Sequence, residues 1–368
     1  MKCFALFPFA VALSVSATGL AHATPTVDSV SIFASGSAVG GTQPDSVTAG
    51  NGSVWIEYGN GADSTGAGGS STIVQYNAAN GAIQHQYMIS GLVDGLKIDA
   101  TTGLVWALQN NDANSTLTLI NPVTHAVSAP LRYGPPYQYT TPGPLARGYD
   151  DVAFDGSKVF LSYTNPTSPT DPVVQELTQG HHPTGLLTTT NILLNEQTGT
   201  NSDTDSLKTT PNGDLVLTSE GDGPGSGSNG VITLISNPGA ANQSVTNVLV
   251  TDGHGNNVQG MDDVLFPSAT SGDLFFTDST NNDVYEAVVS GLDPNTPIAS
   301  LASFGELGLV NMTTGVATPF IDGSNVPGGV LSDPHGVDFI PTPVPEPGSL
   351  TLLGAGLAAV AAFCRRAK

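Results

Sequence analysis

Cysteine is almost absent from this chain, and its two cysteines, Cys3 and Cys364, lie at the extreme ends. The long stretch between them therefore has no disulfide framework, no thiol nucleophile and no cysteine-based metal site. Its stability has to come from a packed core.

Basic residues are also scarce, with nine Lys and Arg against 31 Asp and Glu. Between residues 24 and 345 only five remain against 30 acidic residues, so the net charge of this stretch is near −25. Because binding to a phosphate backbone depends on Lys and Arg, this balance excludes nucleic acid as a partner. A strongly negative field favours solubility and gathers cations. The same acidic composition is equally typical of a generic acidic secreted protein.

Helical patterns are missing between the two ends, where no heptads or long amphipathic stretches occur. A β-hairpin pattern recurs instead, with two strand-like runs joined by a turn that usually contains Gly, as in D-G-L-K-I-D-A-T-T-G-L-V-W-A-L at 94–108. Copies lie at 45–57, 150–162, 205–218 and 262–277, and a sixth starts at His335 and stops after one strand. Copies of one pattern that recur along a chain in this way indicate a propeller, solenoid or repeat array.

Further strand-like segments follow the hairpins, for example 72–76 and 82–88 after the first copy. Four strands in about 50 residues is typical of a propeller blade. We therefore predict an all-β chain with one β-propeller domain at 24–342, most simply of six four-stranded blades, with five or seven as alternatives. For the last inner strand, 336–340, the expected partners are 306–312, 316–321 and an N-terminal strand near 27–33.

The N-terminal segment 1–23 has the pattern of a secretory signal peptide. Lys2 precedes an apolar run at 4–15, and Ala21-His22-Ala23 forms an A-x-A cleavage site. We expect signal peptidase to remove this segment after Ala23.

The C-terminal segment 343–368 has the pattern of a second targeting signal. V-P-E-P-G-S at 344–349 leads into an apolar run at 350–363, which is short for a membrane-spanning helix and is followed by Arg365, Arg366 and Lys368. This arrangement resembles the PEP-CTERM sorting signal of Gram-negative bacteria. The resemblance implies transient inner-membrane anchoring through residues 349–364 by a short transmembrane helix, cleavage by an exosortase, and delivery to the cell surface or extracellular matrix.

Aligned repeats place one residue of each repeat just before its inner strand: Asp45, Asp94, Asp150, Asp205, Asp262 and His335. In a closed ring these side chains surround one mouth of the central channel. Carboxylates about 6 Å apart at an effective dielectric of about 20 repel by roughly 3 kcal/mol per pair, so such a ring favours a bound cation. Ca²⁺ suits oxygen ligands of this kind. The alternative is that each Asp only caps backbone N–H groups in its own turn.

The repeats D-S-V-T-A-G-N-G-S-V-W-I (45–56), T-D-S-T-N-N-D-V-Y-E (277–286) and P-H-G-V-D-F (334–339) resemble blades of NHL, SMP-30/gluconolactonase and streptogramin-lyase-like propellers. Enzymes of these families use a central metal or a catalytic His, so the resemblance implies His335 as the catalytic candidate. No G-x-S-x-G or H-E-x-x-H motif accompanies it.

A Pro-rich loop predicts a sugar-stacking platform for ligand binding, formed by Arg132, Tyr133, Tyr137 and Tyr139. A loop that packs on itself is the alternative. Two functions remain open: a surface-displayed protein that binds an extracellular polysaccharide, another cell-surface component or a cation, and a metal-dependent hydrolase or lyase.

Overall fold

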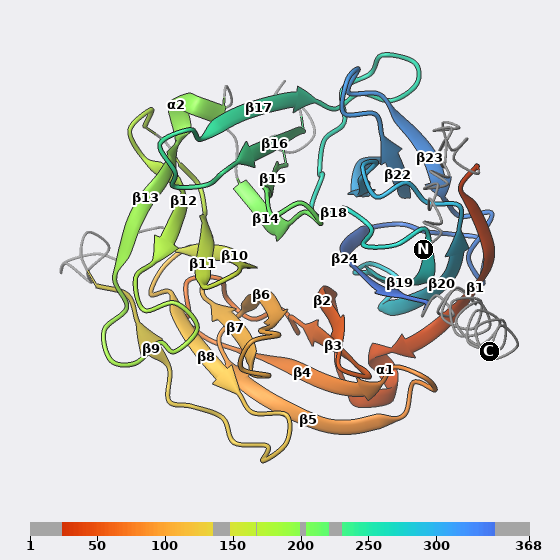
Figure 1. Ribbon diagram of the computed structural model, residues 1–368. Coiled ribbons are helices and arrows are strands. Elements are labelled where there is room, and N and C mark those ends of the chain that lie inside the picture. The colour runs from red at the N-terminus through yellow and green to blue at the C-terminus, as the bar shows by residue number, and fades with distance from the viewer. Residues whose placement is uncertain (1–23, 135–147, 167, 199–203, 221–229, 343–368) are drawn as a thin grey trace, which may run out of the picture.

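The computed structural model describes residues 24–134, 148–166, 168–198, 204–220 and 230–342. These residues form six four-stranded antiparallel sheets arranged around one axis, so the predicted six-bladed β-propeller is confirmed (Figure 1). The predicted signal peptide and the predicted sorting segment lie outside the described residues.

Helix is nearly absent from the described chain, as the sequence predicts. It amounts to α1 (Gly36–Val39), α2 (Asn195–Thr198) and the short 3₁₀ turn η1 (Ala302–Phe304). No helix within these described stretches has the length and apolarity needed to cross a membrane.

The first four blades each use four consecutive strands, from the channel outward. The first two are β2 (Pro44–Gly50), β3 (Ser53–Tyr58), β4 (Ser70–Asn77) and β5 (Ile83–Ser90), then β6 (Val93–Ile98), β7 (Val105–Gln109), β8 (Thr116–Ile120) and β9 (Leu131–Arg132). The next two are β10 (Tyr149–Asp155), β11 (Lys158–Tyr163), β12 (Pro172–Leu177) and β13 (Thr189–Leu194), then β14 (Thr204–Thr209), β15 (Leu215–Ser219), β16 (Val231–Ser236) and β17 (Ser244–Leu249).

The last two blades exchange strands, and here the sequence-based assignment is wrong. After the inner strand β18 (Val264–Leu265) the chain leaves that blade and builds β19 (Ser271–Asp278) and β20 (Asp283–Ser290) of the next one. It then returns to complete the β18 blade with β21 (Ile298–Leu301), β22 (Glu306–Val310) and β23 (Ala317–Ile321). Residues 262–277 are therefore not a hairpin, and 306–312 and 316–321 do not belong with the last inner strand.

The ring is closed by both ends of the described chain. The final strand β24 (Pro334–Pro341) is the inner strand of the sixth blade, and β1 (Thr26–Ser35) is its outermost strand, in the order β24-β19-β20-β1. The expected N-terminal strand in this blade is confirmed. The six inner strands β2, β6, β10, β14, β18 and β24 contact one another in turn around the axis (Figure 1).

Alternating strand residues build the cores between blades. The Trp106 side chain is fully buried with Val152, Val159 and Leu161 of the following blade. Full burial of one large apolar side chain stabilises the fold by about 1.5–3 kcal/mol. The turn between β6 and β7 needs Gly103, whose φ of 72° lies in the left-handed region that glycine adopts without strain.

A register shift at the start of the inner strands determines which side chains face the channel. Pairing of β2 with β3 slips between Pro44 and Val47, and pairing of β6 with β7 slips between Val93 and Leu96. The β10–β11 and β14–β15 pairs slip at the equivalent place. A β-bulge re-aims side chains beside it, and in three of these four blades two consecutive residues line the channel: Asp45 and Ser46, Asp150 and Asp151, and Asp205 and Ser206.

Candidate functional site

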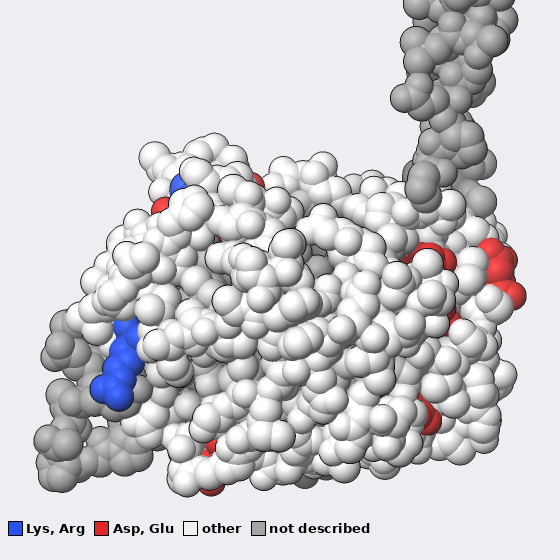
Figure 2. All heavy atoms as spheres, turned by 90° about the horizontal axis from the view of Figure 1, so that it is seen from below, with Lys and Arg blue, Asp and Glu red and all other residues white. Residues whose placement is uncertain are grey.

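The acidic residues predicted to surround one channel mouth do lie together. Their carboxylates line a narrow chamber of about 30 Å³ at the end of the channel where the inner strands begin: Asp45, Asp94, Asp150, Asp205 and Asp262. By contrast, few charged side chains appear on the outer face of the propeller seen in Figure 2. The repeats therefore gather acidic groups on the axis.

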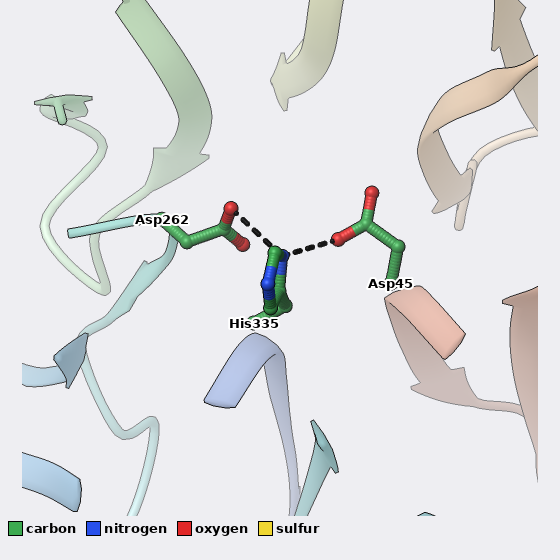
Figure 3. Close-up of side chains that lie close together, drawn as sticks. All are labelled: Asp45, Asp262 and His335. Carbon is green, nitrogen blue, oxygen red and sulfur yellow. Dashed lines mark ion pairs between the residues drawn. The ribbon is translucent and has the colours of Figure 1, made fainter. Parts of the chain in front are cut away.

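His335 contacts carboxylates through both of its nitrogens, and two of these carboxylates belong to the ring. Its Nδ1 atom lies 2.9 Å from Oδ1 of Asp45 and 3.0 Å from Oδ1 of Asp262, and the two carboxylates approach the imidazole from opposite sides (Figure 3). Its Nε2 atom lies 3.4 Å from Oδ2 of Asp333. A neutral imidazole carries one N–H only, so carboxylates at both nitrogens favour the imidazolium.

Electrostatics favour the same protonation state. Burial by itself lowers the pKa of His335, but the charge and hydrogen bonds of Asp262, Asp333 and Asp45 outweigh burial and raise this pKa well above its usual value. Burial raises the pKa of Asp45, and His335 opposes that rise. At neutral pH His335 is therefore a counter-ion of the ring.

A second cluster lies on the other side of Asp262. Carboxylate oxygens of Asp205, Glu220 and Asp262 all lie within 4.8 Å of one another. Burial, together with the charges of Asp262, Glu220, Asp94 and Asp150, raises the pKa of Asp205 well above its usual value. The sequence analysis missed Glu220, because it follows the second strand of its blade and not the first.

An amide bridges two other members of the ring. Nδ2 of Asn111 donates to Oδ2 of Asp94 at 3.3 Å and to Oδ1 of Asp150 at 3.0 Å. Asn111 lies in the turn after β7, and its sequence neighbourhood gave no signal of this role.

Below the ring, the second residue of two repeats caps the inner strand of the next blade. The Asp151 carboxylate accepts hydrogen bonds from the Val152 amide at 2.7 Å and the Leu207 amide at 3.0 Å. The Asp263 carboxylate accepts the Val264 amide at 2.7 Å and the Val337 amide at 2.6 Å. Backbone capping, expected as the alternative role of the ring aspartates, is thus performed by the residues that follow two of them.

Lys208 neutralises this lower layer. Its buried ammonium donates to Asp263 and to the Val337 carbonyl oxygen. Burial lowers the pKa of Lys208, but Asp263, Asp338 and Asp151 more than compensate and raise it. Two tiers result, with a carboxylate ring at the mouth and a lysine–aspartate layer beneath it.

The expected tyrosine platform is not formed by the part of the loop that the structure describes. Tyr133 is 4% exposed and packs against Tyr149 with ring centroids 4.5 Å apart, so its ring is a core element. Arg132 is exposed on the outer strand β9. Tyr137 and Tyr139 lie outside the described residues.

His181 links the turns of two neighbouring blades. Its Nδ1 atom lies 2.8 Å from Oδ1 of buried Asp99, and its Nε2 atom lies 3.0 Å from the Gly156 carbonyl oxygen. It pins the β6–β7 turn of one blade to the β10–β11 turn of the next.

Comparison with known proteins adds one family match. Residues 343–366 match the PEP-CTERM protein-sorting motif. This motif is the recognition signal for exosortase processing and indicates export and surface sorting in Gram-negative bacteria. No protein among curated sequences is significantly similar to this chain.

Several solved structures match part of this chain at low identity. Hydrazine synthase of Kuenenia stuttgartiensis has a TM-score of 0.39 and 10% identity, and the match covers 73% of this chain and 64% of that one, which is less than two thirds of its length. The Pan2 WD40 domain of Neurospora crassa has a TM-score of 0.38 and 8% identity over 81% and 86% of the two chains. TolB of Acinetobacter baumannii has a TM-score of 0.34 and 10% identity over 69% and 57%. The chain thus combines a six-bladed β-propeller with a PEP-CTERM protein-sorting motif at its C-terminal end.

Proposed function

We propose that this exported propeller is a surface-displayed binding protein that holds Ca²⁺ at the acidic channel mouth. The observation that carries the proposal is the position of Asp262, which belongs to two ligand clusters at once. One cluster is made of Asp205, Glu220 and Asp262, and the other of Asp45, Asp262 and His335.

The all-carboxylate cluster is the better calcium site. Ca²⁺ takes six to eight oxygen ligands, and Asp205, Glu220 and Asp262 offer oxygens alone. Without a cation, burial and the charges of the neighbouring carboxylates raise the pKa of Asp205, so they disfavour its ionised form. A bound cation removes that repulsion. His335, as the imidazolium, then neutralises Asp45 at the neighbouring position instead of serving as a ligand.

Strand direction gives the site an orientation. The ring residues lie where the inner strands begin. The last inner strand, β24, starts beside His335 and ends at Pro341, just before the sorting motif at 343–366. The chain leaves the propeller on the face opposite the acidic mouth. While the protein is tethered by its C-terminal segment, the acidic mouth faces outward, where an acidic or hydroxylated extracellular polysaccharide can complete the coordination of Ca²⁺.

Calcium titration of the purified exported protein tests the proposal. Calorimetry should show saturable binding that Asp205→Asn and Asp262→Asn each weaken by at least about tenfold, a change of about 1.4 kcal/mol in binding free energy. Asp28→Asn is the matched control, because Asp28 is an exposed acid on β1 far from the ring. Equal affinity in all four proteins would remove the basis of the proposal.

Hydrolase or lyase activity is the second candidate. The observation that favours it is the contact of His335 with Asp45 and Asp262 beside a candidate metal cluster. Because its pKa is raised, His335 suits the role of a general acid better than that of a general base. Turnover of lactone or uronide substrates that His335→Gln abolishes, with calcium affinity retained, would favour the enzyme.

A further inference from the structure

The opposite end of the channel holds a second and larger cavity. It has a volume of about 530 Å³, within the range of about 300–1,000 Å³ typical of small-molecule sites. We call it the vestibule. Its apolar lining residues come from the ends of four inner strands and the segments that follow them: Ile98, Phe154, Leu265, Phe266 and Phe339.

The lysine–aspartate layer separates the vestibule from the acidic chamber. Lys97 and Lys208 line both cavities, so their side chains form the boundary between them. Two of the five basic residues between 24 and 345 therefore lie on the propeller axis. The two lysines differ in their contacts.

Lys208 is 5% exposed and is committed to Asp263 and the Val337 carbonyl oxygen. Lys97 is partly exposed, and its ammonium makes no hydrogen bond, and no ion pair within 4.0 Å, with any residue in the described stretches. Asp151 attracts it at longer range. Lys97 lines the vestibule together with its apolar residues and the carboxylates of Asp99 and Asp338, and an ammonium offers three donors.

The acidic groups around Lys97 are already engaged by the backbone. Asp151 accepts the Val152 and Leu207 amides, and Asp338 accepts the Ala49 amide at 2.8 Å and the Phe339 amide at 2.8 Å. These carboxylates therefore have less capacity left to hold the Lys97 ammonium. Lys97 therefore lines the vestibule without a hydrogen-bond partner for its ammonium in the described stretches, which leaves it available to an anionic group.

We propose that the vestibule binds a small organic monocarboxylate with an apolar body. Lys97 holds the carboxylate through a charge-assisted hydrogen bond, and Phe154 and Phe266 pack against the body. A single negative charge fits best, because the domain carries a net charge near −25 that repels polyanions such as phosphates. This site is independent of calcium, since the lysine–aspartate layer separates it from the carboxylate ring.

Titration with hexanoate and its neutral analogue hexanamide tests the proposal on the exported protein. We expect saturable hexanoate binding, which Lys97→Met weakens by about tenfold or more and Lys97→Arg largely preserves. Hexanamide should bind at least about tenfold more weakly than hexanoate. Lys158→Met is the matched control, because Lys158 pairs with Glu176 at 3.7 Å on the second strand of its blade.

Two further measurements keep the proposal testable if Lys97→Met folds poorly. Phe266→Ala should weaken hexanoate binding several-fold while calcium affinity stays unchanged, because Phe266 lines the vestibule and not the acidic chamber. Saturating Ca²⁺ should leave hexanoate affinity unchanged, so this proposal and the calcium proposal can fail separately. Equal binding of hexanoate and hexanamide, unchanged affinity in both the Lys97→Met and Phe266→Ala variants, or no saturable hexanoate binding would overturn it.

Discussion

The imidazole of His335, which opens the last strand of the propeller, lies 3.0 Å from the carboxylate of Asp262, which precedes the inner strand of the adjacent blade. The Nδ1 atom that makes this contact also lies 2.9 Å from the carboxylate of Asp45, at the start of the first blade, on the other side of the sixth. His335 therefore ties three consecutive blades together where the ring closes.

His335→Gln should destabilise the protein by about 1–3 kcal/mol near neutral pH, since it leaves three carboxylates without their counter-ion. The His335 side chain is 26% exposed, so solvent keeps this loss moderate. The folded-state pKa of His335 is raised, so its stabilising contribution is complete below the unfolded value of about 6.5 and disappears as pH rises through the folded value. Denaturant unfolding of both proteins between pH 5 and 9 measures this. A stability difference that grows with pH would contradict it.

Asp99→Asn should cost about 1–3 kcal/mol near pH 7, because Asp99 is buried and holds His181, Thr101 and Thr102. Burial alone raises the pKa of Asp99, but hydrogen bonds from Thr102, His181 and Thr101 prevail and lower it. Its contribution is therefore present above the unfolded pKa and is lost as pH falls through the folded one. His181→Asn should behave similarly at neutral pH, whereas the exposed neighbour His182→Asn is the control and should leave the melting temperature unchanged.

Glu57→Gln should stabilise the protein above neutral pH. Glu57 is fully buried in β3, where its carboxylate has no ion pair in the described chain and only the nearby Ser71 hydroxyl opposes the rise of its pKa. Burial raises its pKa well above the usual value, and the charges of Asp45 and Asp94 add to this rise. The folded state binds the extra proton, so stability falls as pH rises from the unfolded pKa toward the folded one. The Gln variant should lack that fall, which parallel chemical denaturation at pH 5 and pH 8 would reveal; identical pH profiles would show that Glu57 is not protonated in the fold.

Gly336→Ala should destabilise the seam by about 2 kcal/mol or more, because an added Cβ would lie 2.5 Å from the Asp45 carbonyl oxygen and 2.8 Å from the Val47 nitrogen. Gly253→Ala is the matched control, since a Cβ added there would have no atom within 4 Å. Thermal unfolding of the two variants compares them. Equal melting temperatures would indicate that the sixth blade does not pack on the first as closely as described.

The repeated strand pattern predicted the six inner strands because each begins with an acidic residue or His335 followed by apolar residues. It failed at 262–277, since a strand of only two residues, Val264–Leu265, is followed by Pro267, which cannot donate to a sheet. That segment resembles a hairpin turn locally, and only tertiary packing sends β19 into the next blade.

The candidate site was partly predictable for a related reason. A fixed repeat position predicts which acids share the channel mouth, but it cannot place Glu220 or Asn111, which lie outside the inner strands. Nor does a period-two strand pattern reveal the register shift that turns Asp151 toward the Leu207 amide, or the contact of Asp263 with the Val337 amide.

The most direct test of the central claim is a crystal structure of the exported protein grown with Ca²⁺. We predict an ion within about 2.3–2.6 Å of carboxylate oxygens from Asp205, Glu220 and Asp262, the usual calcium–oxygen distance. We also predict that His335 remains on Asp45 and does not ligate the ion. A channel mouth without an ion at saturating Ca²⁺, in crystals where these three carboxylates are well ordered, would contradict the account.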